Sequence, residues 1–209
     1  MMIRVFHHAI ELLKQFSKFT LNESEWIKLD KEFCEVPRQN SHTIYRMRKR
    51  ILSYPLKAVL YHGTGIHTAG IILARQGLTT EDRMNTASNF DKKWMRRAKN
   101  KALTHGLLFG PAVYLGKRNK AFAYVTRHNY YKEAPKFGVL IEVSVDLGTI
   151  FEAEKSGNYS NRCDTVHGVP KLTAGILRNE EWAVYDTKRI TIIGFEIVRC
   201  PMIVICFVS

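Results

Sequence analysis

The chain has 209 residues, carries a formal net charge of +13 and is 45% hydrophobic, with 11% aromatic residues. This composition allows a buried core and excludes an intrinsically disordered chain. The length suits one globular domain with room for a small appendage. No apolar run approaches the roughly 18 residues that a membrane-spanning helix needs, so we expect no membrane partner.

The positive charge is unevenly distributed along the chain. Residues 1–58 carry a net charge of +5 and residues 59–136 carry +10, whereas residues 137–209 carry −2. A concentration of positive charge favours phosphates, nucleic acid or acidic protein surfaces as partners. Solubility alone explains such a charge about equally well.

The cysteines and the N-terminus indicate the compartment. The four cysteines form no CxxC pair and have no zinc-ligand spacing, so we expect isolated thiols and no metal site: Cys34, Cys163, Cys200 and Cys206. The first residues lack a continuous apolar segment before a small-residue cleavage site, which is not typical of a signal peptide. We therefore expect a cytoplasmic protein, or a nuclear one if the source is eukaryotic.

Residues 1–57 are expected to form a small helical appendage. Apolar residues at helical spacing predict an amphipathic helix over residues 3–18. A second short helix is expected within residues 21–36, with Asn22 or Ser24 as its N-cap. The segment SHTIYRMRKRIL, from Ser41, is a third helical candidate that is basic on its outer side.

From residue 58 the pattern changes to short β-like runs separated by turn residues. The runs are rich in Val, Ile and aromatic residues, which is typical of strands: KAVLYHG, AVYLG, GVLIEVSVDLG, EEWAVYD and ITIIGFEIV, with MIVICFVS as a buried terminal strand. Short helices are expected between them at 66–76, 91–104 and 118–130. This order predicts an α+β domain over residues 58–209, built on a mostly antiparallel sheet.

Three segments place a polar or aromatic side chain at the edge of a strand. His62 ends the run KAVLYH and is followed by Gly63, where backbone can approach a ligand closely. Tyr114 lies in FGPAVYLG between two glycines, and Glu181 opens EWAVYD. Each feature alone is more often structural, because a strand Tyr is usually core and a Glu at a strand start is usually solvated. The ordered set favours a functional site.

This set resembles the catalytic domain of the poly(ADP-ribose) polymerase family, the ADP-ribosyltransferases with a His-Tyr-Glu triad. LYHGTGIHTAGIILARQGL is similar to the first motif of that family and LFGPAVYLGKRNKAFAYV to the second. FGVLIEVSVDLGTIFE and DTVHGVPK are similar to the strand and the loop that follow, and LRNEEWAVYDTKRITIIGFEIV to the last motif. The resemblance runs from about Ala58 to Val198. It implies the split, mostly antiparallel sheets of the ADP-ribosyltransferase fold, and NAD⁺ as co-substrate without a metal.

The resemblance implies a role for each residue of the donor site. Gly63 would bind the nicotinamide carboxamide through its backbone. His62 would hydrogen-bond a ribose hydroxyl, with Thr64 as an additional ribose contact. Tyr114 and Tyr124 would sandwich the nicotinamide ring, since aromatic stacking holds a flat ligand and a cationic pyridinium gains cation–π energy between two rings.

The same resemblance gives Glu181 the central catalytic role. Its carboxylate would accept a hydrogen bond from the ribose 2′-OH and stabilise the oxocarbenium-like charge that develops as the nicotinamide–ribose bond breaks. Glu180 is the rival residue. Consecutive side chains of a strand point to opposite faces, so only one of the two can enter the cleft. The spacing of the family motif selects Glu181.

Two segments depart from the family pattern. Between Gly77 and Tyr114 the chain is longer than family members usually are, and the surplus contains Trp94 within a basic run: Lys92, Lys93, Arg96, Arg97, Lys99 and Lys101. A solvated helix and a substrate- or polyanion-binding role explain this run about equally well. The link between Lys171 and Glu181 is short, where polymerising members carry a long loop that helps hold the growing chain. We therefore expect transfer of a single ADP-ribose.

Three functions are compatible with these features. The first is a mono-ADP-ribosyltransferase, a glycosyltransferase of the pentosyltransferase class, that modifies a protein side chain and releases nicotinamide. The second is the same chemistry on RNA or DNA, which the charge and Trp94 suit. The third is a module that binds NAD, ADP-ribose or nucleic acid without turnover. The complete triad argues against the third, because a binding module does not need Glu181.

Overall fold

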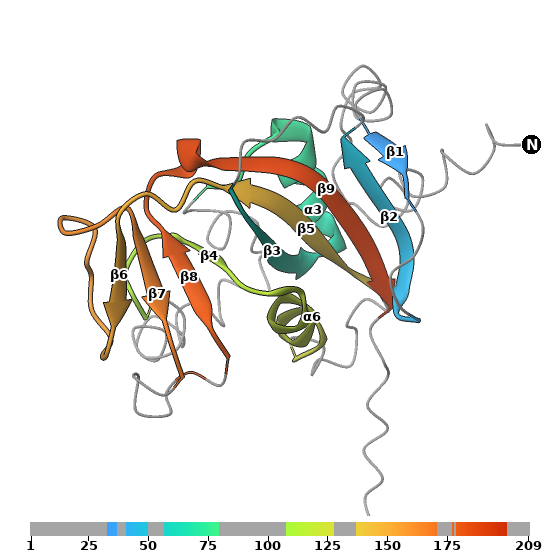
Figure 1. Cartoon of the computed structure of the whole chain (residues 1–209). Helices are drawn as coiled ribbons and strands as arrows, with labels where there is room; N and C mark the ends of the chain where they lie inside the picture. The colour runs from blue at the N-terminus through green and yellow to red at the C-terminus, as the bar shows by residue number, and fades with distance from the viewer. Residues whose placement is uncertain are drawn as a thin grey trace, which may run out of the picture.

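The structure is a computed structural model of the chain, and it describes residues 33–36, 41–49, 57–79, 108–127, 137–170, 177 and 179–199. Over these residues the chain forms two β-sheets and the helices α3 (Ile66–Arg75) and α6 (Arg118–Arg127). Figure 1 shows the two sheets beside each other, with α6 near the place where they meet. The fold is therefore α+β. Within the described ranges, neither the length nor the apolar content of any helix is sufficient for it to cross a membrane.

The larger sheet has antiparallel strands in the order β1-β2-β9-β5-β3. They are β1 (Phe33–Glu35), β2 (Thr43–Lys49), β3 (Ala58–Gly65), β5 (Phe137–Val145) and β9 (Ile190–Arg199). Apolar side chains of α3 pack with Val139 and Ile141 of β5, whereas Ala121 and Val125 of α6 pack with Leu140. Because neighbouring residues of a strand point to opposite faces, α3 and α6 cover opposite faces of this sheet (Figure 1).

The smaller sheet has the strand order β4-β8-β7-β6. Its strands are β4 (Val113–Leu115), β6 (Ile150–Ala153), β7 (Thr165–Gly168) and β8 (Glu181–Val184), and a 3-10 helix η2 (Thr187–Arg189) leads from β8 into β9. All pairs are antiparallel except β6 with β7. Tyr61 of β3 and Gly116 after β4 exchange two backbone hydrogen bonds of 2.8 and 3.0 Å, which join the edges of the two sheets.

The structure confirms most elements expected after residue 58. The runs KAVLYHG, AVYLG, GVLIEVSVDLG, EEWAVYD and ITIIGFEIV are β3, β4, β5, β8 and β9. The helix expected at 66–76 is α3, and the one expected at 118–130 is confirmed as far as Arg127. Three expected elements lie outside the described residues: the helix at 3–18, the helix at 91–104 and the terminal strand MIVICFVS.

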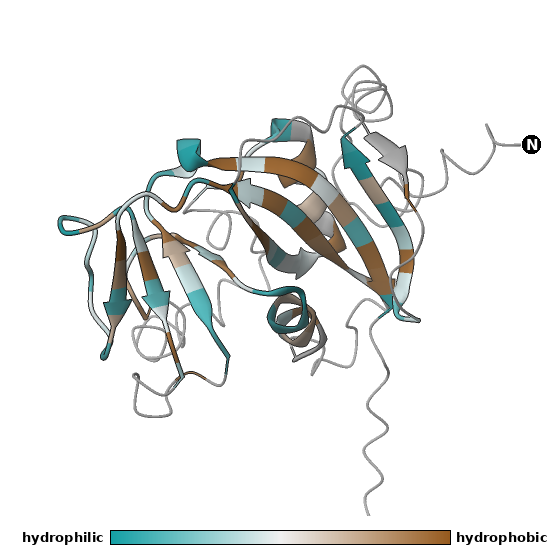
Figure 2. Ribbon diagram, in the orientation of Figure 1, coloured by the Kyte–Doolittle hydropathy of each residue, from teal (hydrophilic) through white to brown (hydrophobic). Residues whose placement is uncertain are grey.

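The helix expected from Ser41 is wrong, because Thr43–Lys49 is strand β2 in the larger sheet. β2 pairs antiparallel with β9 and buries Met47 in the core. Figure 2 shows hydrophilic and hydrophobic residues alternating along β2, which is the period of a strand. The end of the second expected helix is also a strand, since Phe33–Glu35 is β1 and pairs with β2. Within the expected appendage of residues 1–57, the ranges 1–32, 37–40 and 50–56 lie outside the described residues.

The loop expected over DTVHGVPK is also wrong in its first half. Thr165–Gly168 is β7, which lies between β6 and β8 and pairs with both. Thr165 and Val166 are β-branched and fully buried, so they suit a central strand. β6 itself is a strand that the sequence pattern did not predict.

Candidate active site

Five of the six residues expected in the site surround one cavity between the edges of the two sheets. His62 and Gly63 come from β3, Tyr114 from β4, Tyr124 from α6 and Glu181 from the start of β8. The remaining lining residues are Tyr61, Leu115, Gly116, Lys120 and Ala121. The backbone bridge between β3 and β4 brings the elements together, because it fixes the edge of one sheet against the edge of the other.

Thr64 is the expected site residue that does not line this cavity. It lies in β3 opposite Val139 of β5, and its side chain is half-buried. The structure therefore gives no contact between Thr64 and the cavity formed by the other five residues.

The imidazole of His62 is oriented by the backbone of β4. Its Nδ1 lies 3.1 Å from the carbonyl oxygen of Tyr114. A carbonyl oxygen can only accept, so we assign the ring hydrogen to Nδ1 as the donor of this bond. In the neutral imidazole Nε2 is then the accepting nitrogen. In this tautomer Nε2 can accept a hydrogen bond from a hydroxyl group.

The phenol of Tyr114 is held by the loop that precedes β4. Its oxygen accepts a hydrogen bond from the backbone N–H of Phe109 at 2.8 Å and donates one to the carbonyl of Gly110 at 2.9 Å. Gly110 has a φ of +84°, in the left-handed region that glycine adopts easily, and this lets the loop fold back over the ring. Because the hydroxyl is used in these bonds, the face of the ring is the part of Tyr114 that can bind a ligand.

Gly63 allows α6 to pack directly against β3. A Cβ atom at this position would lie 2.3 Å from the carbonyl oxygen of Ala121 and 2.9 Å from Cγ2 of Val125. No real Cβ atom tolerates such a contact with backbone, so any larger residue would push α6 away. The glycine therefore sets the distance between β3 and the helix that carries Tyr124.

We expect Gly63→Ala to lower the free energy of unfolding by about 1–3 kcal/mol, the usual cost of overpacking a closed contact. Gly65→Ala is the matched control, because a Cβ atom there meets nothing within 4 Å and the φ of −70° suits alanine. Its stability should stay within about 0.5 kcal/mol of the wild type, since lost capping and gained backbone stiffness roughly cancel. Urea denaturation measures both, and equal losses would show that the approach of α6 to Gly63 is not the cause.

The two neighbouring glutamates have different surroundings. Glu181 lines the cavity, and its Oε1 lies 3.5 Å from Nζ of Lys120, with both side chains largely buried. Glu180 instead pairs at 2.5 Å with Nζ of the exposed Lys117, and this hydrogen bond lowers the pKa of the Glu180 carboxyl. Glu181 is the first residue of β8 and Glu180 precedes the strand, and the structure places the first carboxylate at the cavity and the second outside it.

Lys120 is the charged residue of this site that the sequence analysis missed. It lies on α6 four residues before Tyr124, so both side chains lie on one face of the helix. That spacing, in KAFAY, is the signal that could have identified it once Tyr124 was a candidate. Its ammonium group places a positive charge beside the Glu181 carboxylate.

The cavity is small. Its volume is about 30 Å³, which is enough for about one or two water molecules. Sites for drug-sized ligands and cofactors usually measure roughly 300–1,000 Å³. As described, the cavity is too small for a nucleotide-sized ligand, so the binding of such a ligand requires the cavity to widen.

No protein-family model matches the chain, and neither does any curated protein. The family is therefore a resemblance that rests on the sequence motifs alone. The basic run from Lys92 to Lys101, with Trp94, lies outside the described residues, and so does most of the link between Lys171 and Glu181.

Proposed function

We propose that the chain transfers a single ADP-ribose unit from NAD⁺ to a protein side chain and releases nicotinamide. The observation that carries this proposal is the meeting of His62, Gly63, Tyr114, Tyr124 and Glu181 at one cavity. The sequence motifs select these residues without any knowledge of the fold. Their convergence from four separate elements on one cavity supports a shared role.

The donor side of the site would bind through His62, Gly63 and the two tyrosines. His62 would accept a hydrogen bond from a ribose hydroxyl at Nε2, because Nδ1 donates to the backbone of Tyr114. The ring of Tyr114, fixed by its hydroxyl, would provide one stacking surface and Tyr124 on α6 the other. Bound NAD⁺ supplies a glycosidic bond whose leaving group is nicotinamide.

Glu181 would stabilise the reacting ribose. A fixed carboxylate lowers the energy of the positive charge that develops at the anomeric carbon as the glycosidic bond breaks. The same carboxylate can orient or deprotonate the incoming nucleophile. Lys120, 3.5 Å from Oε1, would hold the carboxylate in position.

The second candidate is the same reaction on a nucleic acid. The net +10 of residues 59–136 favours it, because each phosphate that a basic residue neutralises adds to affinity. Part of this charge lies in the basic run outside the described residues, so the described site does not by itself select an acceptor.

The test is incubation of the protein with NAD⁺ labelled in the adenine moiety, with either lysate proteins or total nucleic acid as acceptor. We expect label in protein, nicotinamide release and a single ADP-ribose mass increment per modified site. Labelled free ADP-ribose is the control, because it reports addition that needs no enzyme. Label in nucleic acid would support the second candidate, and a ladder of increments would contradict single transfer. NAD⁺ binding without nicotinamide release would make the chain a binding module.

A further inference from the structure

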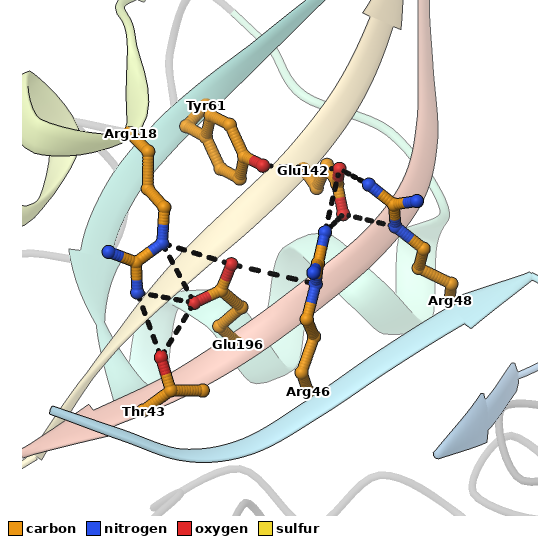
Figure 3. A network of polar contacts seen from close by, with 7 residues as sticks. All are labelled: Thr43, Arg46, Arg48, Tyr61, Arg118, Glu142 and Glu196. Atoms are coloured by element: carbon orange, nitrogen blue, oxygen red, sulfur yellow. Dashed lines mark hydrogen bonds and ion pairs between the residues drawn. The ribbon is translucent and has the colours of Figure 1, made fainter. Parts of the chain in front are cut away.

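A row of five charged side chains crosses the face of the larger sheet on which α6 lies (Figure 3). In spatial order the row is Arg118, Glu196, Arg46, Glu142 and Arg48, so positive and negative groups alternate. The row has a net charge of +1 and contains no residue of the proposed reaction. We call it the charge row.

Arg118 forms one end of the charge row. Its Nη2 lies 2.6 Å from Oε2 of Glu196, and its Nε lies 3.1 and 3.2 Å from the two oxygens of that carboxylate. The same Nη2 donates to Oγ1 of Thr43 at 2.8 Å. The guanidinium fork therefore attaches the first residue of α6 to both β9 and β2.

Arg48 of β2 forms the other end of the charge row and binds Glu142 in the same way, but it does not belong to α6. Nε of Arg48 donates to Oε2 of Glu142 at 2.8 Å, and its Nη2 contacts Oε1 of the same carboxylate. Between the two carboxylates lies Arg46, with Nη2 3.3 Å from both oxygens of Glu142 and Nε 3.6 Å from Oε1 of Glu196. Each carboxylate is thus shared between Arg46 and one outer arginine.

Burial makes these contacts strong constraints on position. The side chains of Glu142 and Glu196 are fully buried, at 0% exposure, and Arg118 is largely buried. A buried carboxylate is tolerated only while it is paired, so a partner that moves away leaves a costly charge behind. The side chain of Arg118 is therefore held more firmly than a surface arginine would be.

We infer that Arg118 is a positioning residue that fixes α6 against the sheet and so sets the α6 wall of the donor cavity. Arg118 precedes Lys120 by two residues and Tyr124 by six on the same short helix. The apolar contact of α6 with the sheet is modest, since it consists mainly of Ala121 and Val125 packed on Leu140 and Val198. The contacts of Arg118 at the first turn then hold the helix in position on the sheet. The role in donor binding rests on the proposed function, whereas the attachment of α6 does not.

The experiment compares Arg118→Met with Arg48→Met. Both changes remove a guanidinium that binds a fully buried carboxylate through Nε and Nη2, and both leave that carboxylate beside Arg46. Only Arg118 belongs to α6. Hydrogen exchange of the α6 amides reports the attachment of the helix, and the Kd for NAD⁺ reports the donor site. Both are compared under conditions in which the two variants have the same free energy of unfolding.

In Arg118→Met we expect the α6 amides to exchange about tenfold faster or more. The Kd for NAD⁺ should rise roughly tenfold to hundredfold, the scale of a small misplacement of binding groups. In Arg48→Met both quantities should stay close to the wild type. Arg118→Lys keeps the charge but loses the fork, so it should lie between the wild type and Arg118→Met.

Equal α6 exchange in the two methionine variants would overturn the inference, because Arg118 would then contribute only general stability. Faster α6 exchange with an unchanged Kd for NAD⁺ would overturn it too. If Arg118→Met does not fold, Arg118→Lys takes its place with the same two measurements. If the wild type binds no NAD⁺, the proposed function fails, and α6 exchange alone decides whether Arg118 fixes the helix.

Discussion

Glu181→Gln is expected to lower nicotinamide release by about 10²-fold or more while leaving the affinity for NAD⁺ close to that of the wild type. Glutamine keeps the size of the side chain but removes the negative charge beside the reacting ribose. Loss of one preorganised electrostatic stabiliser typically lowers kcat by roughly 10²–10³. Single-turnover kinetics gives the rate, and calorimetry gives the Kd for NAD⁺.

Glu180→Gln is the matched control for this change. Glu180 is the preceding residue, pairs with the exposed Lys117 and does not line the cavity. Its replacement should leave both the rate and the Kd near the wild-type values. A large loss of rate in Glu180→Gln with none in Glu181→Gln would reverse the assignment of the two carboxylates.

Local periodicity predicts that only one of these two glutamates enters the cavity, whereas the choice of Glu181 came from the spacing of the family motif. Side chains of a strand alternate, so a strand that begins at Glu181 directs this residue and Trp182 to opposite faces. In the structure Glu181 lies at the cavity, whereas Trp182 packs against the main core. The strand runs after residue 58 were predictable because they are rich in Val, Ile and aromatic residues and are separated by turn residues.

β2 could not be predicted because its charges are paired with distant parts of the chain. Arg46 is only 4% exposed, and its partner Glu142 lies 96 residues further along the chain. Without knowledge of that pairing, the basic residues of RMRKR indicate a solvated surface and favour a helix with one polar face. The strand pattern is present in the sequence, but burial of arginine becomes acceptable only once the carboxylates of β5 and β9 are placed beside it.

The packing around the cavity could not be predicted from the sequence either. The motif His62-Gly63 predicts that another group lies close to the glycine. The structure shows that this group is the carbonyl of Ala121, which the sequence does not predict. Lys120 was missed because its importance depends on how α6 is rotated relative to β8. Such relations are set by packing between elements, and local propensity carries no information about them.

The largest effect on stability is expected at Glu142, a residue outside the cavity. Glu142 accepts hydrogen bonds from Arg46, Arg48 and the hydroxyl of Tyr61. Glu142→Gln removes the negative charge between two guanidinium groups and leaves Arg46 buried beside a like charge. Breaking a buried ion pair on one side costs about 3–5 kcal/mol, so urea denaturation at neutral pH should show a loss of this size.

The pH dependence of that loss separates charge from packing. Burial by itself raises the pKa of Glu142, but the hydrogen bonds and charge of Arg48, together with Arg46, bring the pKa below its usual value of 4.5. A carboxyl group with a lowered folded-state pKa stabilises the fold above its unfolded-state pKa and loses this contribution as pH falls through the folded-state pKa. The difference in the free energy of unfolding between wild type and Glu142→Gln should therefore be complete at neutral pH and should shrink below about pH 4.5.

The exposed Glu152 provides the control, since Glu152→Gln should change the free energy of unfolding by no more than about 0.5 kcal/mol at neutral pH. If the loss in Glu142→Gln were as large in strong acid as at neutral pH, its cause would be the shape of the side chain and not its charge.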